Sequence, residues 1–195
     1  RDILSVITEE HDLTHVVILT YGMGFLFFER LVLPRLIQAG NPAITIFADA
    51  QCAQQSYAHE SGSLIELGKR YRVVPILMAG TGCFHPKAIF LSGKKRGILF
   101  VGSGNLGVGG WRENGEVWIQ FDTNQNETAP FAAFQIYLNK IIRSIPLHDA
   151  IRAELLAAFT SDVHSWAEDL APPSGILGWF PGDRALLSQL EAVLT

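Results

Sequence analysis

The sequence has few cysteines and no long apolar run, and both absences narrow the class of protein. Only Cys52 and Cys83 are cysteine among 195 residues, and they lack the close spacing of zinc or redox motifs. We expect free thiols in a reducing, cytoplasmic compartment, with a disulfide between the two as the alternative. No stretch has the length and hydrophobicity of a membrane span, and no signal peptide is recognisable.

An excess of positive charge is absent as well. The formal net charge is −4 and the pI is about 5.8, so binding of nucleic acid must rest on local patches. With 48% hydrophobic and 17% charged residues, the chain can bury a full core, most simply as one domain. It begins at Arg1 rather than at methionine, and we expect it to be a segment of a longer protein.

Apolar runs alternate with segments of helical periodicity along the first half of the chain. The predicted strands are 15–21, 43–49 and 72–79, and the predicted helices are 1–14, 25–39 and 64–71. Pro34 should break or kink the second helix. Gly22 and Gly24 lack the third glycine of a dinucleotide fingerprint and indicate a close turn. This order indicates an α/β fold with a mixed, mostly parallel β-sheet flanked by helices on both faces.

The last third of the chain is predicted to be helical, with a stretch rich in proline and glycine. The predicted helices are 130–145, 147–159 and 184–194, and 169–182 is predicted to be a linker or wrapped loop. His148 and His164 have no partners at motif spacing, so we expect them at the surface or at an interface.

Residues 82–122 contain the polar groups best suited to chemistry. His85 and Lys87 lie two apart on a predicted buried strand, 84–91, so their side chains point to one face, while Pro86 interrupts the ladder. A second predicted strand ends in a glycine-flanked polar loop, and a carboxylate stands at the entrance of a third. These features are the strand 97–102, the loop residues Ser103, Gly104 and Asn105, and Glu116 at the entrance of the strand 116–121.

Together these groups suit a phosphate. The lysine and the small polar side chains can hold the negative oxygens, a neutral imidazole can attack phosphorus, and the carboxylate can fix the imidazole tautomer. Such chemistry needs no metal or other cofactor. Asp49, at the end of the strand 43–49, is a further candidate, although an aspartate there more often caps the next segment.

The spacing of these groups resembles one half-site of the phospholipase D superfamily, whose HxK and GSxN signature also marks small metal-independent nucleases. The matching residues are His85-x-Lys87, Gly102-Ser103-Gly104-Asn105, and Glu116 eleven residues beyond Asn105. The resemblance implies a phospholipase D-like fold and a phosphodiesterase, foremost a nuclease, that forms a covalent phosphohistidine.

The resemblance also implies a role for each residue. His85 is the nucleophile, Lys87, Ser103 and Asn105 bind phosphate, and Glu116 orients the histidine. One departure is Ser92, which stands where the family usually has aspartate five residues after the lysine. A silent domain that binds nucleic acid or mediates dimerisation is therefore one alternative, and a phospholipid or headgroup phosphodiesterase is another.

Only one copy of the motif is present, whereas the implied chemistry uses two histidines on opposite sides of the phosphorus. The resemblance therefore implies either a homodimer with the site at its two-fold axis or a second motif-bearing half in the full-length chain. Residues 1–170 would form the catalytic domain, and 171–195 would lead towards a further domain. Lys94, Lys95 and Arg96 are expected beside the site, where they either bind a polyanion or form a solvated hairpin turn.

Overall fold

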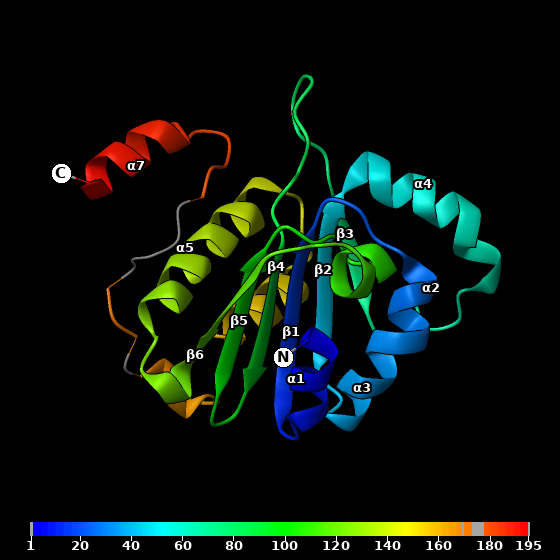
Figure 1. The fold of residues 1–195 in the computed structure, drawn as a ribbon, viewed down its shortest axis with the longest axis horizontal. Coiled ribbons are helices and arrows are strands. Elements are labelled where there is room, and N and C mark those ends of the chain that lie inside the picture. The colour runs from blue at the N-terminus through cyan, green and yellow to red at the C-terminus, as the bar shows by residue number, and fades with distance from the viewer. Residues whose placement is uncertain (1, 169, 173–177, 195) are drawn as a thin grey trace.

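A six-stranded sheet forms the centre of the protein. The computed structural model describes residues 2–168, 170–172 and 178–194. The strands are β1 (Leu13–Thr20), β2 (Ala43–Asp49), β3 (Arg72–Ile76), β4 (Ala88–Gly93), β5 (Gly97–Gly102) and β6 (Trp118–Asp122). The helices are α1 (Ile3–Glu9), α2 (Phe25–Phe27), α3 (Leu33–Gln38), α4 (Ala50–Glu60), α5 (Ala129–Ser144), α6 (Asp149–Ala157) and α7 (Leu186–Leu194). Helices cover both faces of the sheet (Figure 1).

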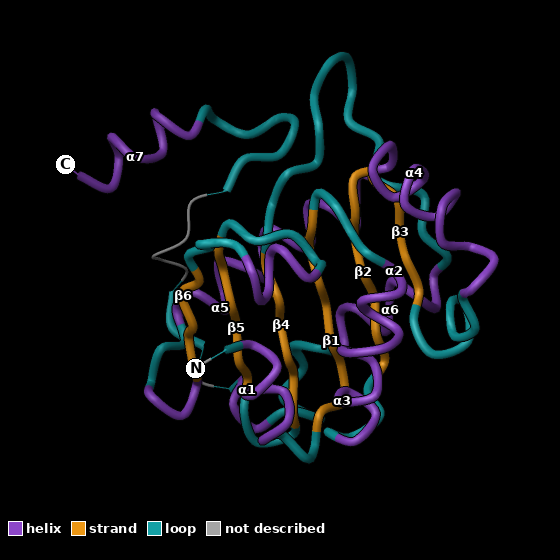
Figure 2. Tube along the Cα trace, turned by 45° about the vertical axis from the view of Figure 1, so that its right-hand side comes forward, coloured by secondary structure: helices purple, strands orange, loops and turns teal. Residues whose placement is uncertain are grey.

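The strand order is β3-β2-β1-β4-β5-β6, as Figure 2 shows. β1 pairs with β2 and β2 with β3 in parallel, whereas β1–β4, β4–β5 and β5–β6 are antiparallel. The expected mixed α/β sheet with helices on both faces is confirmed. Its parallel part covers two of the five pairings rather than most of the sheet, because the short turn between β4 and β5 permits only a hairpin.

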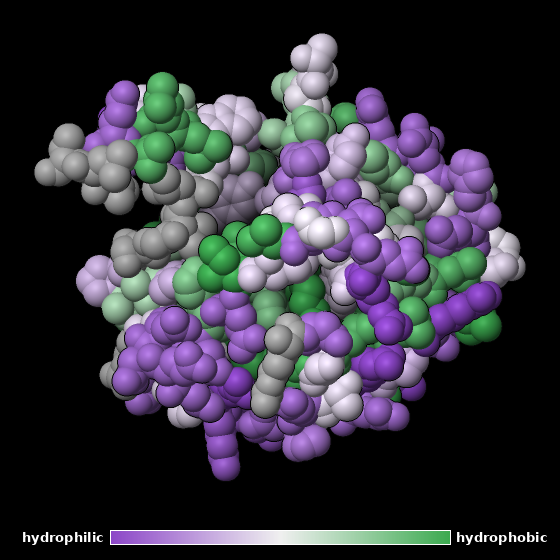
Figure 3. Space-filling model, in the orientation of Figure 1, coloured by the Kyte–Doolittle hydropathy of each residue, from purple (hydrophilic) through white to green (hydrophobic). Residues whose placement is uncertain are grey.

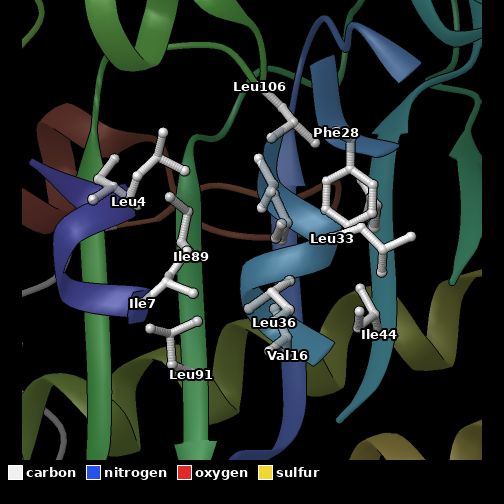
Figure 4. Packing of buried hydrophobic residues seen from close by; sticks show 14 of the residues in the cluster. Leu4, Ile7, Val16, Phe28, Leu33, Leu36, Ile44, Ile89, Leu91 and Leu106 are labelled. Atoms are coloured by element: carbon white, nitrogen blue, oxygen red, sulfur yellow. The ribbon is translucent and has the colours of Figure 1, made fainter. Parts of the chain in front are cut away.

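One face of the sheet buries a largely aliphatic core beneath α1, α2 and α3. Alternate strand residues point to this face, for example Val16 of β1 and Ile89 and Leu91 of β4. They pack against Ile7 of α1 and Leu36 of α3 (Figure 4). The apolar residues that repeat along these helices and strands in the sequence are the ones buried between them.

The opposite face buries an aromatic core beneath α5 and α6. Phe90 is fully buried and stacks on Phe159 with ring centroids 4.5 Å apart. Phe131, Phe134 and Trp166 surround the same ring at centroid distances of 5.6–6.2 Å. Because both faces are covered, the central strands contribute their functional groups only at their ends.

The predicted helix 25–39 exists, and Pro34 modifies it without ending it. α2 continues through one wide π-helical turn, Phe28–Val32, into α3, which has Pro34 in its first turn. A proline there has no N–H to donate and its ring crowds the preceding turn, so a wider turn relieves the clash. The helical segment therefore stays continuous.

The prediction of a helix at 64–71 is wrong, and the helix of this region is α4. Asp49 caps α4, because its Oδ1 accepts from the N–H groups of Gln51 and Cys52 at 3.1 and 3.2 Å. The backbone N–H groups of residues 65–67 instead donate to the carboxylate of Glu29. A carboxylate that takes three amides holds this segment as an irregular turn.

Several predicted boundaries move by a few residues. β4 begins at Ala88 rather than 84, since Pro86 cannot donate to a ladder. The strand expected at 72–79 ends at Ile76, and Leu77 is 78% exposed. Asp169 and residues 173–177 of the predicted linker lie outside the described residues. The division between 1–170 and 171–195 stays a prediction.

Candidate active site

The signature residues gather at one end of the sheet, the upper end in Figure 1. The parallel strands β1, β2 and β3 end there, β4 and β6 begin there, and β5 ends there. The N–H of Gly102 donates to the carbonyl of Lys87 at 3.1 Å, and that of Ser103 donates to the carbonyl of Val117 at 3.0 Å. These bonds join the two halves of the motif.

His85 and Lys87 contact each other directly. The Lys87 Nζ lies 2.6 Å from Nδ1 and 3.1 Å from Nε2 of His85, and it donates to the His85 carbonyl at 3.0 Å. His85 is exposed, whereas Lys87 is only 7% exposed. An ammonium at this distance needs a ring nitrogen without a proton, so the contact favours a neutral imidazole.

The surroundings lower the pKa of both groups. Burial lowers the pKa of His85, the positive charge of Lys87 lowers it further, and Asp49 acts weakly in the opposite direction. Burial also lowers the pKa of Lys87, while the charge of Glu116 is among those that raise it. At neutral pH the site therefore combines a neutral imidazole with a cation beside it.

We expect Lys87→Met to raise the pKa of His85, because methionine keeps the apolar stem and removes the ammonium that disfavours imidazolium. An NMR titration of the imidazole C–H resonance measures this pKa, and His85→Gln identifies the resonance. Lys94→Met, in an exposed turn at the other end of the sheet, should leave the titration unchanged. A His85 pKa that stays constant or falls in Lys87→Met would contradict the proposed coupling.

Tyr21 and Asp49 help to position the motif histidine, Tyr21 by direct contact and Asp49 through the neighbouring backbone. Tyr21, at the end of β1, lies against the imidazole with ring centroids 4.7 Å apart, and the Lys87 Nζ is 5.7 Å from the same phenol ring. Asp49 Oδ2 accepts from the N–H of Phe84 at 3.0 Å, while Oδ1 caps α4. The sequence pointed to Asp49 as a strand-end residue, and the capping role is the one found. Nothing in the spacing marked Tyr21.

The glycine-flanked loop docks on the turn after β1. The Asn105 Oδ1 accepts from the N–H of Gly22 at 3.1 Å, and the N–H of Leu106 donates to Thr20 Oγ1 at 3.0 Å. Gly104 is buried, and a Cβ there would lie 2.2 Å from the carbonyl oxygen of Gly110. Close backbone packing thus explains this glycine. Asn105 holds the loop near the end of β1, while Ser103 remains exposed.

Glu116 bonds to the serine of the motif. Its Oε2 accepts from Ser103 Oγ at 2.5 Å, and Asn114 Nδ2 donates to its Oε1 at 3.4 Å. Among the described residues, no hydrogen bond joins Glu116 to His85. The predicted role of Glu116 in orienting the histidine remains a proposal, and its observed contact orients Ser103.

The expectation that Lys94, Lys95 and Arg96 lie next to the site is wrong. They form the turn between β4 and β5, and the full length of both strands separates this turn from Lys87 and Gly102. Lys94 and Lys95 are exposed, as a solvated hairpin turn requires. Arg96 pairs with Asp122 and Glu10 at 2.5 and 2.6 Å. Because β4 begins at the site end of the sheet, the turn that follows it lies at the opposite end.

Ser92 lies at the end of the sheet that carries the β4–β5 turn, and its contacts there are structural. Its hydroxyl is buried and donates to the carbonyl of Ala158 at 2.9 Å, and it lies 3.3 Å from His164 Nδ1. The expectation that His164 is a surface or interface residue is wrong, since it is fully buried and also contacts the carbonyl of Gly93 at 3.0 Å. Ser92 thus packs the segment after α6 onto β4, away from the reacting groups.

The described residues contain neither a metal-ligating cluster nor a membrane-spanning helix. No three His, Cys, Asp or Glu side chains within 2–168, 170–172 and 178–194 are grouped so that they could hold a metal ion. None of the helices in these ranges combines the length and the apolar character needed to cross a membrane. Both cysteines are free thiols, and Cys83 is exposed two residues before His85.

Comparison with known proteins gives matches only in structure. No protein-family model and no curated protein sequence matches the chain. A mutant of yeast tyrosyl-DNA phosphodiesterase is 15% identical with a TM-score of 0.50, over 80% of this chain and 35% of the yeast chain. NucT from Helicobacter pylori is 19% identical with a TM-score of 0.47, over 70% of this chain and 84% of NucT. Polyphosphate kinase from Porphyromonas gingivalis is 12% identical with a TM-score of 0.43, over 74% and 24%.

At these identities the likeness concerns the fold. The chain shares its fold with the yeast tyrosyl-DNA phosphodiesterase, which agrees with the phospholipase D-like fold that the motif predicted. It spans about a third of the yeast chain, so the activity of that enzyme as a whole does not transfer with the fold.

Proposed function

We propose that this chain is a metal-independent phosphodiesterase that cleaves nucleic acid through a covalent phosphohistidine on His85. The observation that carries the proposal is the contact between Lys87 and a neutral His85 at the edge where the strands end. An imidazole with a low pKa has a free lone pair at neutral pH, and the neighbouring ammonium is ready to bind an anionic oxygen. Both are requirements of attack on a phosphodiester.

In the proposed first step, a ring nitrogen of His85 forms a bond to phosphorus while the bond from phosphorus to the leaving oxygen breaks. A second histidine on the opposite side donates a proton to that oxygen. When phosphate binds, its oxygens accept the hydrogen bonds of the Lys87 ammonium in place of the His85 ring nitrogen, which leaves the imidazole lone pair free for attack. Ser103 and Asn105 complete the phosphate site, and each well-placed donor lowers the barrier by about 3 kcal/mol.

In the second step, water attacks phosphorus, the bond to His85 breaks, and the second histidine takes the proton of the water. The second histidine comes from a second copy of the chain in a homodimer or from another half of a longer protein. Glu116 orients His85 once the phosphate is bound, in addition to its contact with Ser103. The free thiols fit the proposed cytoplasmic location.

DNA is the first substrate to test, because the yeast structure with the same fold is a tyrosyl-DNA phosphodiesterase. The experiment measures hydrolysis of single-stranded DNA, duplex DNA, RNA and bis(p-nitrophenyl) phosphate with and without excess EDTA. We expect cleavage of at least one polymer, with no loss of rate in EDTA. A rate that disappears in EDTA and returns with a divalent cation would overturn metal independence. A folded protein that cleaves none of the substrates would favour the silent binding domain.

A further inference from the structure

An apolar cavity of about 390 Å³ opens beside His85 and Lys87. This volume lies in the range of small-molecule sites, about 300–1,000 Å³. Strand residues Leu19 and Val101 line it. Its aromatic walls are Phe134 and Tyr137 of α5 and Trp179 and Phe180 of the segment before α7. The motif residues alone do not account for this aromatic lining.

The C-terminal wall of this cavity is fixed by several contacts. The Tyr137 hydroxyl donates to the carbonyl of Trp179 at 3.4 Å, and Gln189 Nε2 donates to the carbonyl of Gly178 at 3.0 Å. Lys140 of α5 pairs with Asp183 at 2.6 Å. The Trp179 side chain is nevertheless 45% exposed, which leaves part of its surface available at the rim.

We propose that this cavity binds an unpaired nucleobase of the nucleotide that adjoins the scissile phosphate. The inference rests on the proposed function and names the form of its substrate. His85 and Lys87 line the same cavity as Tyr137 and Trp179, so a group attached to a phosphate at His85 reaches the aromatic walls. A base in a duplex cannot enter such a cavity, because its faces are stacked and its edge is paired.

The chemistry of the walls predicts how the base is recognised. Aromatic side chains stack on any base, and few polar groups line the cavity to read the edges of a base. The Tyr137 hydroxyl is already bonded to the carbonyl of Trp179. The cavity therefore selects single-stranded substrate with little preference among the four bases.

An acyl chain is the competing occupant, and α7 argues against it. Leu186, Leu187 and Leu190 are exposed on this helix, which carries apolar side chains at the upper left of Figure 3. Helices that lie in a membrane surface usually carry lysine or arginine on their polar face. The sequence of α7, LLSQLEAVL, contains neither and has one glutamate, so anionic membranes gain no attraction from it.

The test uses single-stranded DNA oligonucleotides with one abasic residue at successive positions. We expect the wild type to cleave at least about fivefold more slowly where the abasic residue adjoins the cut, because one stacked base is lost. Trp179→Ala should cleave intact and abasic oligonucleotides alike, and Trp179→Phe should restore the difference. Leu187→Ala, an exposed α7 residue that does not line the cavity, is the matched control and should behave as the wild type.

Binding separates this proposal from the proposed function. Fluorescence anisotropy measures the affinity of the same oligonucleotides, and bis(p-nitrophenyl) phosphate reports the chemistry of His85 alone. If the small diester is not hydrolysed, the proposed function fails, while weaker binding of intact oligonucleotide to Trp179→Ala still supports the cavity. Equal affinity of wild type and Trp179→Ala, equal affinity for duplex, or an effect of Trp179→Ala only on vesicles of anionic phospholipid would overturn the inference.

Discussion

Replacing His85 with alanine should lower the rate of phosphodiester hydrolysis at least about 10⁴-fold, because the proposed nucleophile is then absent. The measurement is initial-rate hydrolysis in excess EDTA of the polymer that the wild type prefers. His59→Ala is the matched control, since His59 is exposed on α4 and its Nδ1 contacts only the carbonyl of Gln55 among the described hydrogen bonds. A His85→Ala protein that is folded and retains activity would refute the nucleophile assignment.

The pH dependence follows from the state of His85. Its pKa lies below the ordinary imidazole value of about 6.5 in solution, because of burial and of the Lys87 charge. The nucleophile must be neutral, so activity is lost as pH falls through this lowered pKa. We expect the acid limb of kcat/KM below the ordinary imidazole range, and the limb should shift to higher pH in Lys87→Met.

A mixing experiment distinguishes the two sources of the second histidine. In a homodimer whose single site uses His85 from both copies, only pairs of wild-type chains are active. When wild type and His85→Ala chains are unfolded together and refolded, activity should fall as the square of the wild-type fraction. A linear fall would show that each chain works with its own second histidine or without one.

The sequence predicted the parts of the fold whose signals are local. β2 and β5 have the predicted boundaries, because each is an apolar run bounded by residues that end strands. The α/β class followed from their alternation with helices. The helix at 50–60 was not predicted although a capping role was expected for Asp49, because α4 buries only Ala53 and so lacks an apolar stripe of helical spacing. The amides at 65–67 bind Glu29 through a contact that spacing cannot reveal.

The sequence predicted which residues form the candidate site better than it predicted their positions and contacts. His85 and Lys87 contact each other as near neighbours in the segment immediately before β4. Tyr21 escaped prediction, since its contact with His85 depends on β1 and β4 being neighbours. The turn at 94–96 was misplaced for the same reason, because the direction of a strand decides to which end its charges go. Long-range pairing is the information that local pattern lacks.

Replacing Arg96 with methionine should destabilise the protein by about 3 kcal/mol, the lower part of the range for breaking a buried ion pair. Arg96 bridges Asp122 and Glu10, whose side chains are only 4% and 7% exposed, while its own side chain is 27% exposed. Its loss leaves two buried carboxylates close together without a cation. Urea unfolding at pH 7 measures this loss of unfolding free energy. The loss is a large share of a typical protein stability of about 5–15 kcal/mol.

The neighbouring Lys95→Met is the control, because Lys95 is exposed in the same turn, and it should change stability by no more than about 0.5 kcal/mol. The dependence of the stability on pH also tests the role of the Arg96 charge. Burial by itself would raise the pKa of Asp122, but hydrogen bonds from Arg96 and from the Asn124 N–H, together with the Arg96 charge, outweigh it, so the folded-state pKa is lowered. The wild type therefore gains stability from Asp122 above the unfolded pKa and loses it as pH falls through the folded value.

In Arg96→Met the sign reverses for Asp122, because burial and repulsion from Glu10 then raise its folded-state pKa; the pKa of Glu10 is already raised by burial in the wild type and rises further without the Arg96 charge. Protonation of both carboxyls relieves that variant, so its stability rises as pH falls, whereas in the wild type the gain from Glu10 is smaller and is opposed by the loss from Asp122. The difference between the two should narrow steadily from pH 7 towards pH 4. A difference that stays constant over this range would show that Arg96 stabilises the fold through packing of its stem and not through its charge.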